Sequence, residues 1–252
     1  MTARAQIGWG WAGLMKPLFP GGAPRLSPLA TIPADPTAHR LLAGQSIRGR
    51  LIKRTGDILF SLLVLGLGAP VFLVLAVVVK LSSRGSVFYV QRRIGRGYKS
   101  FGCIKFRTMR KDADRHLASV LASSEELRAE FARDFKLKAD PRITPIGRVL
   151  RRSSLDELPQ FLNVLKGQMS VVGPRPIVWD ELERYGRSMD AVLAVRPGMT
   201  GLWQVSGRNN LSYPNRVRLD LHYARNRTVW LDLQIILRTI GVVLFPRDRG
   251  AY

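Results

Sequence analysis

The sequence predicts an α+β fold, mostly helical with one small β-hairpin, in a monotopic membrane protein that carries an N-terminal re-entrant helix hairpin. Two observations lead to this prediction. A stretch of 22 residues, from Ile58 to Val79, has no charged side chain and contains a proline near its middle. After it, short β-branched or aromatic runs are followed by longer stretches in which apolar residues recur with a helical period.

The composition limits the size of the fold and the kind of partner. The chain has 252 residues and a hydrophobic fraction of 46%, so it can bury one domain-sized core. Its 40 Lys+Arg outnumber its 18 Asp+Glu and give a formal charge of +22. Such a charge predicts anionic partners: nucleic acid, an acidic membrane surface or phosphorylated small molecules. The single cysteine excludes an internal disulfide and a Cys-based zinc site.

We expect three segments along the chain. Residues 1–46 are rich in Pro, Gly, Ala and Ser and show no apolar period, so they are expected to form a disordered N-terminal tail. Residues 47–81 contain the charge-free stretch and are expected to be the membrane re-entrant helix. Residues 82–252 are expected to form a cytoplasmic domain.

The charge-free stretch is long enough to meet a membrane, but its middle is expected to bend. A straight helix of 22 residues would be roughly 33 Å long, against a hydrocarbon layer of about 30 Å. Pro70 removes a backbone hydrogen bond, and Gly66 and Gly68 lie close by. Basic residues flank both ends, and the positive-inside preference places both on the cytoplasmic side. A re-entrant hairpin satisfies both features, and an ordinary kinked span is the alternative.

Further elements follow the membrane segment. Ser86–Gln91 and Phe101–Phe106 are separated by a glycine-containing turn, which predicts the β-hairpin. Residues 111–136 show apolar residues among charged ones, as in a surface helix or helix pair. Residues 214–226 and 229–245 are two more helical patterns. The second has an apolar stripe that would lie on the core or in the lipid headgroup layer.

The stretch RRSSLDELPQFLNVLKG, residues 151–167, places two adjacent carboxylates in a basic region. Ser154 and Glu157 fit a helix capping box, which would give the acids a structural role only. Pro159 would then lose a backbone bond inside the helix, so we expect the helix to begin later or to be distorted. Near a helix N-terminus a carboxylate such as Asp156 stays ionised and phosphate oxygens are attracted. Aspartate can attack phosphorus there if cations screen the electrophile.

Basic residues that could hold an anion beside the acids come from the preceding residues, the GPRP motif and the expected second strand: Arg151, Arg152, Arg175, Lys105 and Arg107. Two prolines stiffen the backbone around Arg175, which suits a guanidinium that makes two bonds to an oxyanion. The alternative is that Arg175 lies in a solvated turn. Lys105 and Arg107 could likewise form a solvated strand face.

Four motifs occur in order along the chain: KFRTM, DPRITPIGR, LRRSSLDELPQFLNVLKGQMSVVGPRP and RPGMTGLWQVSGR. Together they resemble the bacterial sugar transferase family, the monotopic phosphoglycosyl transferases that act on polyprenyl phosphate, over roughly residues 53–252. The resemblance implies that a hexose-1-phosphate, with galactose favoured, passes from a UDP-sugar to undecaprenyl phosphate and that UMP is released. It implies the first step of an exopolysaccharide repeat unit, catalysed by residues 82–252 on the cytoplasmic face of the bacterial inner membrane.

The resemblance also implies roles for single residues. Asp156 would be the nucleophile that forms an aspartyl phosphosugar and would bind Mg²⁺, and Glu157 would be its dyad partner and proton acceptor. Three cations match positions associated with the phosphate site: Lys105, Arg151 and Arg175. Pro70 would be the kink of the re-entrant helix. The chain has Ala69 before this proline, where the family often has serine.

Two other classes of protein are compatible with the charge. A membrane-tethered nucleic-acid binder would need aromatic platforms or a reading helix among its basic residues. The sequence has neither, so no nucleic-acid partner is expected. A non-catalytic membrane scaffold in polysaccharide assembly would keep both the fold and the charge, and it remains the alternative function.

Overall fold

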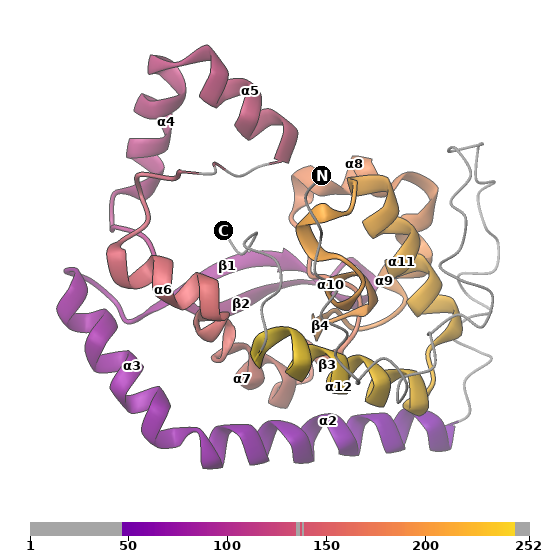
Figure 1. The fold of residues 1–252 in the computed structure, drawn as a ribbon. Coiled ribbons are helices and arrows are strands. Elements are labelled where there is room, and N and C mark those ends of the chain that lie inside the picture. Colours follow the sequence, from indigo (N-terminus) through magenta and orange to yellow (C-terminus); the bar gives the residue numbers. More distant parts are fainter. Residues whose placement is uncertain (1–46, 135–136, 138, 245–252) are drawn as a thin grey trace, which may run out of the picture. The chain divides into compact units, whose positions relative to one another are not determined.

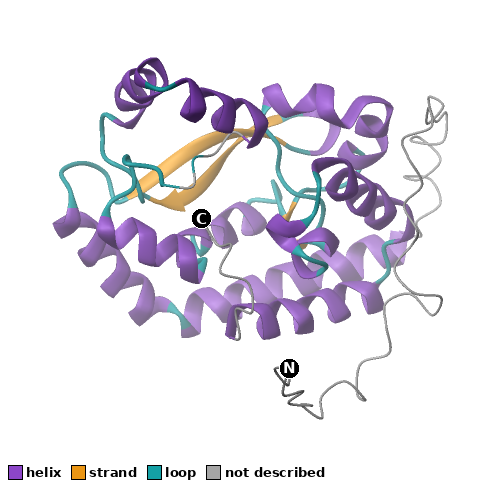
Figure 2. Cartoon of the chain, turned by 45° about the horizontal axis from the view of Figure 1, so that its top comes forward, coloured by secondary structure: helices purple, strands orange, loops and turns teal. Residues whose placement is uncertain are grey.

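The structure is a computed structural model, and it describes residues 47–134, 137 and 139–244. The expected N-terminal tail, residues 1–46, lies outside the described residues. Within the described part, helices dominate and the strands form two separate pairs (Figures 1 and 2). The prediction of a mostly helical fold with a small antiparallel hairpin is confirmed, and the second strand pair is an addition to it.

The expected membrane segment forms two helices separated by a sharp bend. Helix α2 runs from Ile47 to Leu67 and α3 from Ala69 to Ser82, with an angle of 65° between them. Pro70 lies in the first turn of α3, where its missing N–H costs no helical hydrogen bond. Among the described helices, none alone is long and apolar enough to cross a membrane. The two helices of this bent pair together have the length and the apolar composition for it.

The β-hairpin consists of β1 (Phe88–Ile94) and β2 (Ser100–Phe106), which pair antiparallel. Gly97 in the connecting turn has a φ of 65°, which glycine adopts without steric cost. Phe106 at the end of β2 lies 5.6 Å, centroid to centroid, from Phe72 of α3. The hairpin therefore packs directly against the second of the two bent helices.

The longer helical patterns are also confirmed. The expected surface pair is α4 (Ala113–Ser123) and α5 (Glu125–Asp134), and the C-terminal patterns are α11 (Tyr213–Asn226) and α12 (Val229–Leu244). In α12, Ile235 is fully buried. Most of the predicted apolar stripe is exposed instead: Val229, Leu233, Ile240 and Val243. The stripe therefore does not pack on the core of the described chain.

Helix α6 (Pro145–Ser153) is fixed at its first turn by two close contacts. The hydroxyl of Thr144 accepts a hydrogen bond from the backbone N–H of Gly147 at 2.9 Å and so caps the helix. A Cβ atom on Gly147 would overlap the backbone carbonyl of Thr108, just after β2. Glycine is therefore required for α6 to approach the hairpin this closely.

The second strand pair is short and parallel. It joins β3 (Ser170–Val172) to β4 (Gly198–Thr200). Short helices complete the fold: α7 (Gln160–Leu165), α8 (Leu182–Tyr185), α9 (Met189–Leu193) and α10 (Leu202–Val205). One hydrophobic cluster joins the end of β1 to α8, α9 and α11, and a smaller cluster joins α3, β2 and α6.

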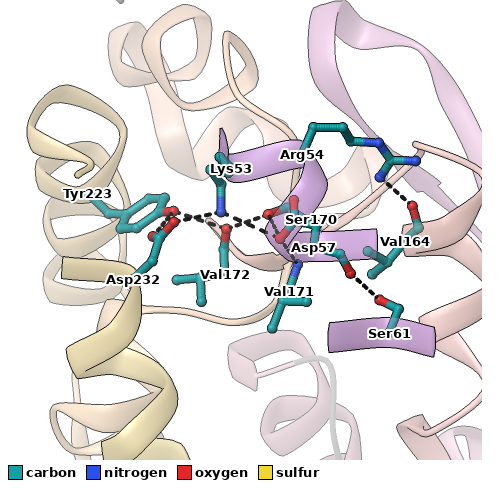
Figure 3. Close-up of polar contacts among 10 residues, drawn as sticks. All are labelled: Lys53, Arg54, Asp57, Ser61, Val164, Ser170, Val171, Val172, Tyr223 and Asp232. Carbon is teal, nitrogen blue, oxygen red and sulfur yellow. Dashed lines mark hydrogen bonds and ion pairs between the residues drawn. The ribbon is translucent and has the colours of Figure 1, made fainter. Parts of the chain in front are cut away.

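Buried polar groups attach α2 to the rest of the described chain (Figure 3). The ammonium group of Lys53 lies 2.7 Å from a carboxylate oxygen of Asp232 on α12. Tyr223 of α11 donates its hydroxyl proton to the other oxygen of Asp232 at 2.6 Å. Asp57 accepts hydrogen bonds at 3.0 Å from the Ser170 hydroxyl and from the Val171 backbone in β3. Both acids are buried and hydrogen-bonded, as buried charges require.

We expect Gly147→Ala to lower the free energy of unfolding by ~1–3 kcal/mol, because the added methyl group meets a backbone carbonyl that cannot turn aside. The matched control is Gly241→Ala in α12, where a Cβ atom meets nothing within 4 Å. The control should be neutral or stabilising by up to ~1 kcal/mol. Thermal unfolding of the purified protein in detergent measures both variants. Equal midpoints for the two would show that the contact at Gly147 relaxes easily.

Candidate functional site

The two adjacent acids lie in a 3₁₀ turn between α6 and α7. The turn spans Leu155–Glu157, and α7 begins at Gln160. Ser154 has a φ of 58° and ends α6 in the left-handed region, and its side chain makes no capping hydrogen bond. The capping-box interpretation is therefore wrong, and the expectation of a later helix start is confirmed. The acids precede α7 instead of lying in its first turn.

Helix α7 is held from two sides, which fixes the turn before it. The guanidinium of Arg54 on α2 donates to the carbonyls of Val164 and Leu165 at 2.6 and 2.9 Å (Figure 3 shows Arg54 beside Val164). The side-chain amide of Asn163 bonds two backbone groups of β2, at 2.7 and 2.9 Å. The position of the acids is thus set by α2 and by the hairpin together.

A salt bridge from β2 determines the charge of Glu157. Its carboxylate lies 2.6 Å from the ammonium group of Lys105. Burial acts to raise the pKa of Glu157, but Lys105, together with Arg175 and Arg93, outweighs burial and lowers it. Glu157 is therefore ionised at neutral pH.

The pKa of Asp156 is shifted in the opposite direction from that of Glu157. Its side chain is buried, and burial raises its pKa to about 6, with the negative charge of Glu157 adding to the effect. Lys105 and Arg151 act in the opposite direction and do not cancel it. Adjacent carboxyl groups with separated pKa values are the usual sign of divided chemical roles. At neutral pH Asp156 is mostly ionised, and it is the more basic of the two.

A pocket opens beside Glu157. Three cationic side chains line it together with this acid: Arg93, Lys105 and Arg175. Arg175 lies between two prolines and is half-buried, and its guanidinium carbon lies 5.9 Å from the centre of the Trp203 ring. The arrangement suits an anion with several oxygens, because two cations from the hairpin and one from the GPRP turn line the same pocket.

Sequence reasoning missed Arg93. In the hairpin register Lys105 pairs with Tyr89 and Cys103 pairs with Gln91. Because side chains alternate between the two faces of a strand, Arg93 belongs to the same face as Lys105. This alternation is the signal that would have placed Arg93 in the pocket once the register was known.

The remaining predicted cations lie elsewhere. Arg151 donates to the Thr108 hydroxyl at 2.9 Å and acts on the charge of Asp156 without lining the pocket. Arg107 is buried and donates to the carbonyl and hydroxyl of Ser83 at 2.6 and 3.0 Å, because the chain has already left β2. Arg152 is exposed. The structure thus places neither Arg107 nor Arg152 at the pocket and assigns Arg107 to the attachment of α3.

The oxygen donors near the acids fit a metal ion that is shared with a substrate. They do not fit a site in which protein ligands alone enclose the metal. Within the residues that the structure describes, no three His, Cys, Asp or Glu side chains are grouped to hold a metal. Mg²⁺ commonly binds one or two carboxylates together with substrate phosphates and water. Asp156 offers one such carboxylate, whereas Glu157 is engaged by Lys105. The residues present fit Mg²⁺ only when a phosphate ligand completes the coordination.

We expect Asp156→Asn to stabilise the fold at neutral pH. Well below pH 4 the carboxyl group is protonated in both the folded and the unfolded state, so it contributes no difference, and at pH 4 the difference is still small. Since the folded pKa is raised to about 6, the charged form costs free energy in the folded state, and this cost grows as the pH rises from about 4 to 6. Above pH 6 the variant should be more stable by ~1–3 kcal/mol.

Unfolding midpoints at pH 4 and pH 7.5 test this expectation, with the exposed Asp180→Asn as the control. A stabilisation by Asp156→Asn that is the same at both values of pH, or absent at pH 7.5, would contradict the raised pKa of Asp156.

Comparison with known proteins bears on this site. The family model described as "Bacterial sugar transferase" matches residues 48–246. An uncharacterized sugar transferase of Haemophilus influenzae is 52% identical over 82% of this chain and 43% of its own. An undecaprenyl-phosphate galactose phosphotransferase of Salmonella typhimurium is 50% identical over 81% of this chain and 42% of its own. The chain thus spans less than half the length of these two relatives.

A third relative has nearly the same length. The exopolysaccharide production protein ExoY of Sinorhizobium fredii is 46% identical over 88% of this chain and 94% of its own. The family match includes α2, the acid pair and every cation of the pocket. The chain belongs to the bacterial sugar transferase family.

Proposed function

We propose that this protein transfers a hexose-1-phosphate from a UDP-sugar to undecaprenyl phosphate and releases UMP. Galactose-1-phosphate is the preferred group in this proposal. The observation that carries the proposal is the acid pair, in which Lys105 holds Glu157 at 2.6 Å and leaves the adjacent Asp156 more basic. The name of the Salmonella relative supports the acceptor and the sugar, and the name of the Sinorhizobium relative supports a role in exopolysaccharide production.

The proposed reaction has two displacements at one phosphorus atom. A carboxylate oxygen of Asp156 attacks the sugar-bearing phosphorus of the UDP-sugar, and the bond to the bridging oxygen breaks, so that UMP leaves with the electron pair. An oxygen of undecaprenyl phosphate then attacks the aspartyl phosphosugar, and the carboxylate of Asp156 leaves. The lipid diphosphate sugar is the product. Covalent catalysis of this kind divides one difficult displacement into two easier ones.

The other charged groups act on the phosphates. Lys105, Arg93 and Arg175 line the pocket and would neutralise the diphosphate as negative charge develops on the leaving group. The lowered pKa of Glu157 makes it a poor proton acceptor at neutral pH, so we assign it the task of holding Lys105 at the pocket. Mg²⁺ bound by Asp156 and the diphosphate would supply further charge neutralisation.

We also propose that the protein rests in the cytoplasmic face of the bacterial inner membrane. The bent pair α2 and α3 leaves large apolar side chains exposed, and so does α12: Leu59, Leu63, Leu67, Leu73, Val74, Trp230, Leu237 and Ile240. An apolar surface of this extent marks a membrane or partner contact. The 65° bend and the basic residues at both ends of the pair favour a re-entrant hairpin.

Purified protein with Mg²⁺ and undecaprenyl phosphate should release UMP from UDP-galactose, and Asp156→Asn should abolish the release. Without the acceptor lipid, the wild type should show a sugar-phosphate mass increment on the peptide that contains Asp156. Asp180→Asn, which removes an exposed carboxylate, is the control and should retain activity. A folded wild type with no turnover on any UDP-sugar would support the scaffold alternative. Turnover by the Asp156→Asn variant would exclude Asp156 as the nucleophile.

Single-cysteine labelling should show both ends of the helix pair on one side of the membrane. The native Cys103 is buried, and burial raises the pKa of its thiol, so it provides a silent background. Cysteine at the exposed positions Arg48 and Arg84 should react with an impermeant maleimide in inverted vesicles and not in intact spheroplasts. Labelling of Arg48→Cys from the outside would show that the pair spans the membrane.

A further inference from the structure

The GPRP turn that carries Arg175 is bonded to the rest of the chain on both sides of that residue. The backbone carbonyl of Pro174 accepts a hydrogen bond from the N–H of Gly198 at 2.7 Å. The backbone carbonyl of Pro176 accepts one from Nη1 of Arg93 at 3.0 Å. The turn is therefore attached to β4 before Arg175 and to β1 after it.

Strand β1 also holds the residues that follow the turn. The backbone N–H of Ile94 donates to the carbonyl of Ile177 at 2.9 Å, in an isolated antiparallel bridge. The next residue, Val178, donates its backbone N–H to a carboxylate oxygen of Glu181 at 3.0 Å. The same oxygen lies 3.7 Å from Nη1 of Arg93. The end of β1 is thus joined to the segment after Arg175 by two direct bonds and by an ion pair through Glu181.

The nitrogen atoms of Arg93 are engaged within the protein, although the residue lines the pocket. Nε and Nη2 both donate to the side-chain oxygen of Gln91, at 3.2 and 2.7 Å, and Nη1 donates to Pro176. Arg93 is buried, and a buried guanidinium needs partners of this kind. Its positive charge reaches the pocket, but its hydrogen bonds hold the hairpin to the turn.

The guanidinium of Arg175 has different surroundings. It lines the same pocket, and its carbon atom lies 5.9 Å from the centre of the Trp203 ring. Within the part of the chain that the structure describes, it forms no hydrogen bond and no ion pair. Its N–H groups are therefore left for an anion in the pocket, while bonds on both sides restrain the backbone that carries it.

We propose that Arg93 is a positioning residue of the donor site and that it acts through Arg175. Its bond to the carbonyl of Pro176 fixes the turn, so the guanidinium of Arg175 meets a phosphate oxygen of the nucleotide sugar with little rearrangement. Donors that are fixed in advance give strong electrostatic stabilisation. The assignment rests on the proposed function, because it takes a nucleoside diphosphate as the ligand of the pocket.

Two substitutions of Arg93 separate its bonds from its charge. Arg93→Lys keeps the charge, but an ammonium group cannot bond Gln91 and Pro176 with the geometry of a planar fork. This variant should lower kcat/KM for UDP-galactose ~10-fold to 100-fold, because a misplaced Arg175 loses most of its effect. Arg93→Met, which removes the charge as well, should cost at most about threefold more. UMP release gives kcat and KM, and calorimetry with UDP, which should bind more weakly to both variants, gives a Kd without turnover.

A double-mutant cycle shows through which residue Arg93 acts. In the Arg175→Gln background, Arg93→Lys should lower kcat/KM and UDP affinity by less than about twofold further, because the guanidinium that the turn presents is already absent. The Kd values for UDP give the same cycle independently of turnover.

Two further variants test the hairpin side of this contact. Gln91→Met removes the acceptor of two Arg93 nitrogen atoms, and it changes neither the charge nor the lining of the pocket. It should lower kcat/KM ~3-fold to 10-fold, and it tests the proposal if the Arg93 variants do not fold. Arg92→Lys is the matched control, because Arg92 is the exposed neighbour on β1 and lies outside the pocket lining. It should leave kcat/KM and the Kd for UDP unchanged.

Wild-type kinetics and UDP binding in folded Arg93→Lys would overturn the proposal, and so would an equal loss from Arg93→Lys in both backgrounds. UDP binding that depends on Arg93 and Arg175 together, in a protein without UMP release, would keep the positioning assignment and reject the transferase reaction. Loss of turnover in Asp156→Asn, with Arg175→Gln fully active, would keep the reaction and reject the assignment.

Discussion

The fold of the described chain depends on the buried charges that join α2 to the domain. Asp57 leaves water when α2 docks and Lys53 does so in part, and a buried charge is tolerated only with close partners. Asp57 finds them in the backbone and side chains of β3, and Lys53 finds Asp232 on α12. These contacts favour one position of α2, because a shift of one helical turn would break the bonds from β3 to Asp57 and the bond from Lys53 to Asp232, and would leave only the ion pair of 3.7 Å between Lys53 and Asp57 within the helix. The same position presents Arg54 to the end of α7.

The chemistry of the acid pair follows from this placement. With α7 held by α2 and β2, the turn before it carries Glu157 to Lys105, and the salt bridge keeps that carboxylate ionised. Asp156 is left as the less solvated neighbour of an existing negative charge, so its pKa rises to about 6. A single lysine on a strand thus differentiates two chemically similar side chains that are adjacent in sequence.

Local patterns predicted most of the fold, and long-range pairing accounts for what they missed. The hairpin, the bend and the long helices depend on neighbouring residues, so periodicity and glycine or proline signals were sufficient. Strand β4 has three residues and exists only because β3 lies beside it. In the site, the acids and Lys105 were identified from the sequence, whereas Arg93 required the hairpin register. Arg107 follows the predicted end of the strand, and the sequence does not show that its side chain turns to Ser83 at the end of α3.

The exposed stripe of α12 shows which side of one further ambiguity the structure excludes, namely packing on the core. Periodicity identified an apolar face but could not say whether it meets the core or the lipid. The structure buries Ile235 and exposes the stripe, on a helix that Asp232 joins to Lys53 of α2. The helices that carry the two exposed apolar surfaces are therefore joined by this ion pair. In the proposed function, the depth of α2 in the bilayer then sets the height of α12 and, through Arg54 and α7, the height of Asp156. A phosphate at the lipid surface could reach that carboxylate without a hinge between membrane and domain.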